Sequence, residues 1–202
     1  MRDKRPGRED AFTGLEAAIV LIAFVIIAAE FSYVILGAGF STTQKSQEVV
    51  HSGVTQAASN IVVKGEVYGI NTTDDTGVEF IRFNVGLAAG GTPVDMTRTS
   101  MTFSTADTAP YTVEYDGKIG TGKEPDIPAA KSGEWTIFEI QSNDGTADGT
   151  LNYGETFILY FAPKGSILPR EYLLLEIQPE IGAALAVERT VPPSITNTTL
   201  FF

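Results

Sequence analysis

The chain has 202 residues, which is enough for one domain of ordinary size and an appendage. Its 25 acidic residues outnumber its 14 basic ones, and the net charge of −11 disfavours nucleic-acid binding, which relies on Lys and Arg to neutralise phosphates. It has no cysteine, which excludes disulfides and thiol chemistry, and its one histidine, His51, excludes most histidine-based metal and catalytic sites.

An apolar segment near the N-terminus dominates the chain. Residues 15–36 are apolar almost without pause and are interrupted by Glu16, Glu30 and Ser32. At about 1.5 Å per residue, a helix of this length comes close to spanning a bilayer. The pattern predicts a membrane span or a buried helix. Residues 1–11, which are charged and basic at their start, precede it and suit the cytoplasmic side of a membrane.

This junction of a short charged leader and an apolar helix resembles a type IV pilin-like precursor. The resemblance implies cleavage by a prepilin-type leader peptidase between Ala11 and Phe12, a precursor held in the membrane, and a membrane assembly platform. Glu16 is then the fifth residue of the mature chain, and its carboxylate can pair with the new α-amino group of its own or a neighbouring copy. The alternative is an ordinary signal peptide removed whole, with residues 37–39 as the small-residue cleavage site.

The helix is expected to continue beyond the apolar segment as an amphipathic one. Residues 40–61 keep a stripe at three- and four-residue spacing: Phe40, Thr43, Gln47, Val50, Val54, Ala57 and Ile61. Gly37 and Gly39 predict a bend, since each costs roughly 1 kcal/mol in a helix interior. We expect a solvated helix face linked by ion pairs at Lys45, Glu48 and His51. Glu30 is expected to snorkel or to find a partner on a neighbouring helix.

From residue 61 onward the sequence pattern is typical of β-strands. Short runs rich in Val, Ile, Phe, Tyr and Thr alternate with Gly, Asp, Asn and Pro clusters and predict seven or eight antiparallel strands. In residues 81–87, apolar and polar residues alternate, which is typical of a strand with one buried face. Trp135 is expected in the core. The fold class is therefore α+β, a long N-terminal helix (residues 12–60) followed by an antiparallel β-sandwich or barrel (residues 61–202).

Three later segments, taken in order, resemble archaellins, the archaeal flagellins. They are GEVYGI (residues 65–70), FNVGLAAGGTPVDMTRTSMTF (83–103) and the C-terminal series GETFILYF (154–161) and EYLLLEIQPEIGAALAVERTVP (171–192). The resemblance implies an immunoglobulin-like outer domain, helices bundled in the core of an extracellular homo-oligomeric filament, and rotation of that filament for swimming. The alternatives are an adhesive pilus subunit and a membrane-anchored binding module that never polymerises.

Catalytic chemistry is not indicated, because no Ser, Thr or carboxylate is accompanied by a plausible base. Residues 144–155, DGTADGTLNYGE, match five of six signature positions of the twelve-residue calcium loop. They predict a structural Ca²⁺ held by Asp144, Thr146, Asp148, Thr150, Asn152 and Glu155. The alternative is a hairpin connection held by local side-chain turns.

Two N-x-S/T sequons predict glycosylation of an exported protein. Asn71 begins the first, in an expected loop, and Asn197 begins the second, near the C-terminus.

Overall fold

The structure is a computed structural model, and it describes residues 8–72, 77–120, 122, 131–141 and 148–202, with the side chains of residues 8–12 left aside. The chain forms two compact units, residues 1–52 and residues 53–202. The described part of the first unit is helical, and the second unit is a β domain that includes the last helical residues.

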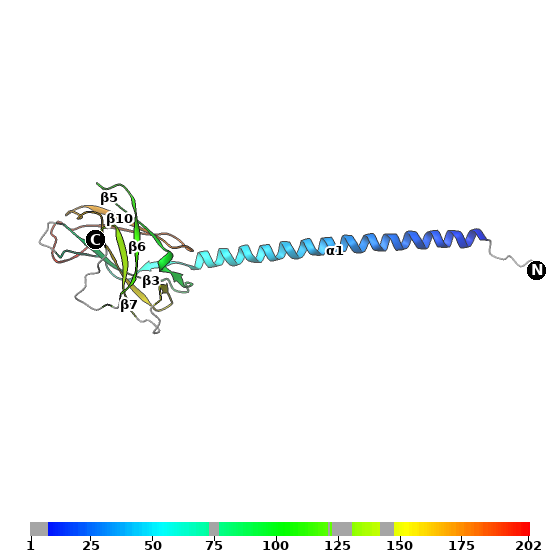
Figure 1. The fold of residues 1–202 in the computed structure, drawn as a ribbon, viewed down its shortest axis with the longest axis horizontal. Helices are drawn as coiled ribbons and strands as arrows, with labels where there is room; N and C mark the ends of the chain where they lie inside the picture. The colour runs from blue at the N-terminus through cyan, green and yellow to red at the C-terminus, as the bar shows by residue number, and fades with distance from the viewer. Residues whose placement is uncertain (1–7, 73–76, 121, 123–130, 142–147) are drawn as a thin grey trace, which may run out of the picture. The chain divides into compact units, whose positions relative to one another are not determined.

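Helix α1 extends from Arg8 to Ala58 as one element, drawn from blue to cyan in Figure 1. It passes through Gly37 and Gly39 without interruption, so the expected bend does not appear as a break. The hydroxyls of Thr42 and Thr43 donate to the carbonyls of Ala38 and Gly39, both at 2.9 Å. Two glycines cost too little to end a helix of 51 residues.

The β domain has more and shorter strands than expected. The strands are β1 (Ile61–Val63), β2 (Tyr68–Ile70), β3 (Phe80–Leu87), β4 (Val94–Asp95), β5 (Ser100–Thr105), β6 (Tyr111–Ile119), β7 (Glu134–Gln141), β8 (Thr150–Leu151), β9 (Thr156–Phe161), β10 (Tyr172–Gln178), β11 (Leu185–Thr190) and β12 (Thr198–Leu200). The sequence pattern predicts a single strand in residues 61–70, but a turn at Gly65, where φ is +86°, divides it. It also predicts a single strand in residues 93–103, which the 3₁₀ helix η1 (Met96–Arg98) divides.

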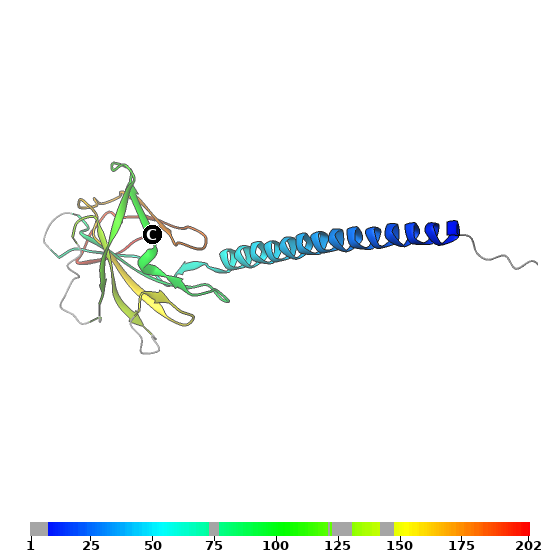
Figure 2. The ribbon, with the colours of Figure 1, turned by 45° about the vertical axis from the view of Figure 1, so that its right-hand side comes forward.

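The larger sheet folds over itself into a sandwich (Figures 1 and 2). Its order is β11-β10-β5-β6-β7-β9-β3-β2-β12, with β1 also pairing with β3. Phe103 on β5 and Phe161 on β9 meet across the interior with ring centroids 4.7 Å apart. The two halves of the sheet therefore enclose one core, as the predicted fold class requires.

The prediction of a wholly antiparallel sheet is wrong at one pair. Strands β6 and β7 are parallel, with an irregular register between Tyr115 and Ile119. The connection through residues 120–133 is long enough for the crossover that a parallel pair needs. This pair forms the corner where the sheet turns from one layer to the other.

The core follows the alternation that the sequence predicts. Ile81, Phe83 and Val85 on β3 are buried, while Arg82 and Asn84 on the opposite face are half-buried. Trp135 is fully buried, which confirms its expected place, and its ring stacks at 4.6 Å from that of Tyr115.

Phe201 lies in this core near the end of the chain. Its side chain is 1% exposed, and its N–H donates to the carbonyl of Val67 at 3.0 Å. The next residue, Phe202, exchanges two backbone hydrogen bonds with Thr190 at the end of β11, at 2.9 and 3.3 Å. These bonds bring the two outer strands of the sheet together, so the sandwich is partly closed like a barrel.

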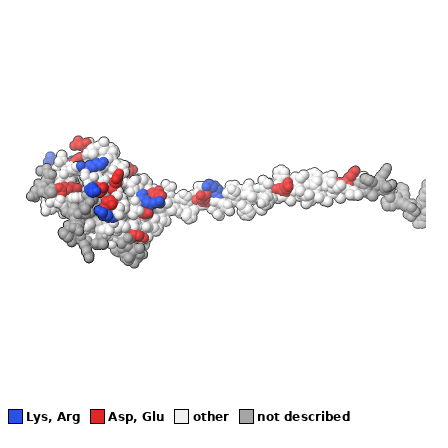
Figure 3. All heavy atoms as spheres, in the orientation of Figure 1, with Lys and Arg blue, Asp and Glu red and all other residues white. Residues whose placement is uncertain are grey.

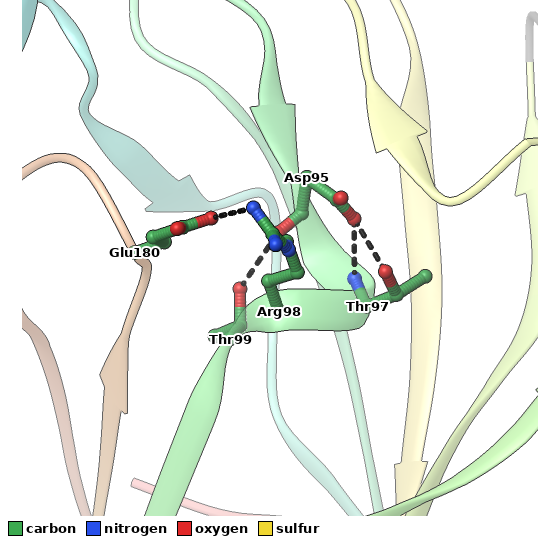
Figure 4. Close-up of polar contacts among 5 residues, drawn as sticks. All are labelled: Asp95, Thr97, Arg98, Thr99 and Glu180. Atoms are coloured by element: carbon green, nitrogen blue, oxygen red, sulfur yellow. Dashed lines mark hydrogen bonds and ion pairs between the residues drawn. The ribbon is translucent and has the colours of Figure 1, made fainter.

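Segment 93–103 carries a small polar cluster at η1 (Figure 4). Asp95 caps η1 by accepting hydrogen bonds from the N–H and hydroxyl of Thr97, at 2.9 and 2.6 Å. Arg98 forms an ion pair with Glu180, at 2.7 Å, and so ties η1 to the segment after β10.

Candidate functional site

The apolar segment of α1, residues 15–36, is the largest candidate interface in the described chain. Every Leu, Ile, Val and Phe side chain in it is between 52% and 68% exposed. The helix is long and apolar enough to cross a membrane, by length and composition. Because the hydrophobic effect scales with exposed apolar area, such a surface must be covered by lipid or by other protein.

Charged groups are sparse along this helix and gather instead on the β domain (Figure 3). Glu16 and Glu30 are the only charged residues between residues 13 and 44, and no Lys, Arg or His accompanies them there. Both lie in the exposed part of the helix. A carboxylate covered by apolar side chains is costly unless it is paired or protonated, so a partner for Glu30 has to come from another molecule or from water.

The second half of the helix has the solvated face that the sequence predicts. Lys45 and Glu48 form an exposed ion pair at 2.7 Å. Pairs of this kind contribute little to stability, typically about 0.3–0.5 kcal/mol on a helix. This ion pair therefore adds little to the stability of the helix.

A shallow hollow interrupts the helix surface at Gly39. Ser32, Ile35, Leu36, Phe40 and Thr43 surround it, and a Cβ added at Gly39 would meet no atom within 4 Å. Residues 32, 35, 36, 39, 40 and 43 lie at helical spacing on one face. The hollow is therefore a place where a side chain of a neighbouring helix could pack.

Ser59, the residue after α1, is packed within the β domain. Ser59 is 2% exposed, its N–H donates to the carbonyl of Thr55 at 2.9 Å, and its hydroxyl lies 2.6 Å from that of Thr92. Gly182, at φ +128°, allows the backbone of Ser59 to approach closely, and a Cβ there would collide with the Ser59 carbonyl.

The predicted cleavage junction lies inside the helical range. Ala11 and Phe12 are helical in backbone, but their side chains are outside the described part of the chain, as are residues 1–7. The processing of this junction therefore stays a prediction.

The described part of the predicted calcium loop, residues 148–155, makes local hydrogen bonds. The Asp148 carboxylate accepts from the N–H of Thr150 at 3.0 Å, and the buried Glu155 carboxylate accepts from the N–H of Asn152 at 2.7 Å. The Asn152 amide donates to the Thr150 carbonyl at 3.3 Å, and Thr150 itself lies in β8, paired with β4. Local bonds of this kind, from side chains to nearby backbone groups, are those expected if residues 144–155 form a hairpin connection instead of a calcium loop.

Asp144 and Thr146, the first two expected ligands, lie outside the described residues. Within the described ranges, no three His, Asp or Glu side chains gather in a way that could hold a metal. The calcium site stays a prediction.

The two predicted glycosylation residues prove to be neighbours. The N–H of Asn71, just after β2, donates to the carbonyl of Asn197, just before β12, at 3.0 Å. Asn197 is exposed and Asn71 is half-buried. In the second sequon, the Thr199 hydroxyl is already bonded to Thr196. The pairing of β2 with β12 could not be read from two motifs more than a hundred residues apart.

Comparison with known proteins gives the family. The model of archaeal-type flagellin matches residues 11–189. A probable flagellin 2 of Archaeoglobus fulgidus is 39% identical over 202 residues, covering 95% of this chain and 94% of the relative. A 24 kDa flagellin of Methanospirillum hungatei is 78% identical over a stretch of 32 residues, 16% of this chain.

Comparison with solved structures indicates the same family. The archaeal flagellum of Methanospirillum hungatei strain JF1 matches with a TM-score of 0.69 and 33% identity, covering 94% of this chain and 99% of that one. A crystal structure of an archaeal flagellin from Methanocaldococcus jannaschii shares the fold, with a TM-score of 0.63, 20% identity, and coverage of 71% of this chain and 97% of that one. The resemblance and the fold class expected from the sequence are both confirmed, and the chain belongs to the archaeal-type flagellin family.

Proposed function

We propose that this archaeal-type flagellin is a structural subunit of an extracellular helical filament, the archaellum, and that copies assemble by packing their α1 helices together. The observation that carries this proposal is the exposed apolar segment, residues 15–36, on a chain 33% identical to a solved archaeal flagellum. Flagellins of this family are structural proteins, which agrees with the expectation that the chain is not an enzyme.

The energetics favour assembly. Burying a Leu, Ile, Val or Phe side chain contributes roughly 1.5–3 kcal/mol. Bringing two proteins together costs about 4–15 kcal/mol, so covering a handful of these side chains offsets that cost. The apolar segment offers many more, from Leu15 to Leu36. A stalk that never polymerised would leave this area exposed once it had left the membrane.

The precursor needs a cover for the same surface before assembly, and a bilayer supplies it. The length and hydropathy of α1 support membrane insertion of the precursor. The family match begins at residue 11, which supports a leader that ends there and is removed between Ala11 and Phe12. The freed amino group of Phe12 would then neutralise the Glu16 carboxylate in an apolar setting, in its own copy or a neighbouring one. A prepilin-type leader peptidase and a membrane assembly platform complete this proposal.

Processing is tested by N-terminal sequencing of subunits from purified filaments. The expected first residue is Phe12, with the apolar segment retained. A mature chain that began beyond Phe40 would contradict both the cleavage and the assembly proposals.

Assembly is tested by electron microscopy of chains that lack residues 12–40. We expect no filaments, because the described part of the β domain exposes no apolar surface comparable with that of residues 15–36. Filaments formed by the truncated chain would contradict the proposal. Motility of cells that carry only this filament separates an archaellum from an adhesive pilus.

The role of Glu30 is tested by Glu30→Gln, with Glu48→Gln as the matched control. Both remove one carboxylate from the same helix, but Glu48 already has an exposed partner in Lys45. We expect Glu30→Gln to shift the temperature of filament dissociation and Glu48→Gln to leave it nearly unchanged. Equal dissociation temperatures for wild type and both variants would show that the charge of Glu30 is incidental.

A further inference from the structure

A hollow of about 710 Å³ lies on the face of the β domain that points away from the main core. Tyr68 on β2, Arg82 on β3 and Tyr160 on β9 are direct neighbours across three paired strands and form its centre. Its volume falls within the range of about 300–1,000 Å³ that is typical of small-molecule sites. No residue of it belongs to α1, so the assembly proposal does not account for it.

The chemistry of the hollow differs from that of the surrounding surface. The Arg82 guanidinium lies 6.0 Å from the centroid of the Tyr160 ring, and Asn84 adds an amide from the next outward position on β3. No Asp or Glu is among the described residues that line it, although the chain carries a net charge of −11. A lone cation with amides and hydroxyls around it suits an anion that also carries hydroxyl groups.

The rim of the hollow is formed by both sequon asparagines. Asn71 and Asn197 line it together, joined by their backbone hydrogen bond of 3.0 Å. A sugar attached to either residue would leave the protein at the mouth of the same hollow.

We propose that this hollow binds an acidic saccharide, with Arg82 holding its carboxylate. The planar guanidinium can donate two parallel hydrogen bonds to a carboxylate, a geometry that Lys cannot match. Asn84 provides donor and acceptor atoms for sugar hydroxyls, and the half-buried ring of Tyr68 offers surface for the less polar face of the sugar. The Tyr160 ring is 3% exposed and lies beside the Arg82 guanidinium, which it helps to hold in place. A phosphate-rich ligand fits less well, because a single cation offers too little charge neutralisation.

The saccharide has two sources with the same chemistry. It is either a sugar linked to Asn71 or Asn197 of the chain itself, folded back into the hollow, or a free saccharide from outside. Comparing native filaments with the full-length chain made in a bacterium without N-glycosylation, kept in detergent, separates the two sources.

The probe is glucuronic acid, with glucose as the neutral comparison, and binding is followed by saturation-transfer NMR. We expect the unglycosylated chain to bind glucuronic acid and to bind glucose far more weakly. Arg82→Gln should weaken glucuronic acid binding about tenfold or more, because hydrogen bonds to charged groups are among the stronger ones. Arg82→Lys should restore it in part.

Arg98→Gln is the matched control, since it also removes one positive charge but lies in η1, outside the hollow. It should leave binding unchanged. Asn84→Ala provides a second test should Arg82→Gln fail to fold, and it should also weaken binding.

Binding of glucuronic acid to both native filaments and the unglycosylated chain supports a free saccharide. Binding to the unglycosylated chain alone supports an attached sugar that already fills the hollow, and an Asn71→Gln/Asn197→Gln chain from the native host should then regain binding. Equal signals for glucuronic acid and glucose, or equal binding by wild type, Arg82→Gln and Asn84→Ala, would overturn the proposal.

Discussion

Replacing Phe201 by Ala should destabilise the β domain far more than the same change at Phe202. The two residues are adjacent and chemically identical, but Phe201 is 1% exposed and Phe202 is 72% exposed. Both make backbone hydrogen bonds, Phe201 to Val67 and Phe202 to Thr190, and these bonds persist in Ala variants. The comparison therefore isolates the packing of one ring.

The expected loss follows from the burial. Truncation of a buried Phe to Ala typically costs about 3–5 kcal/mol, which combines lost transfer free energy with the cavity left behind. A substitution on an exposed surface usually changes stability by less than about 0.5 kcal/mol. In a unit of this size, 1 kcal/mol corresponds to roughly 2–4 °C in Tm, so Phe201→Ala should melt about 6–20 °C lower than wild type.

The assay is thermal unfolding of the full-length chain in detergent, followed by the fluorescence of Trp135, which lies in the same core. Phe202→Ala should melt within about 2 °C of wild type. If both variants melt together with wild type, the packing of the Phe201 ring does not contribute to the stability of the core.

Three further predictions concern the β domain. Burial, and then the charges of Asp116 and Asp95, raise the pKa of Tyr115 from 10.0 to about 12. As the pH rises, the unfolded chain therefore loses the Tyr115 proton before the folded chain does. The free energy of unfolding should be unaffected below pH 10 and should decrease as the pH rises from 10 towards 12. Equilibrium unfolding measured against pH should show a smaller decrease for Tyr115→Phe than for wild type. If calcium binds at residues 144–155, Tm should be higher in millimolar Ca²⁺ than in chelator, and Asp148→Ala should abolish this difference. Equal Tm values for wild type and variant under both conditions would show that the loop is only a turn. Gly69→Ala should destabilise the domain by about 1–3 kcal/mol in denaturant titration, because the added Cβ would lie 2.5 Å from the Phe201 ring; unchanged stability would show that this ring can move aside.

The long helix and its exposed apolar segment could be predicted because they depend on local pattern alone. The pattern of residues 15–36 favours no structure other than a helix, and the two glycines at 37 and 39 cost too little helix stability to end it. The alternation along β3 is local too, and it placed Ile81, Phe83 and Val85 in the core.

Pairing between distant segments could not be predicted in this way. The parallel pairing of β6 with β7 is a contact between separate strands, which the two-residue period within each strand does not encode. The apolar residues Leu200, Phe201 and Phe202 were visible in the sequence, but only the structure shows that Phe201 alone is buried. The hollow around Arg82 is hidden for the same reason, since four strands contribute to it.

The closed end of the sandwich also bears on how the filament can form. An open sheet edge is a template for pairing with another chain, and natural proteins shorten or cover such edges. Here Phe202 pairs with Thr190 at the end of β11, and charged residues Glu188 and Arg189 occupy the same strand. Edge-to-edge addition of β domains is therefore disfavoured, while the apolar surface of α1 is left uncovered. This closed edge is consistent with the proposal that association takes place through the helix, where apolar area would supply the driving force.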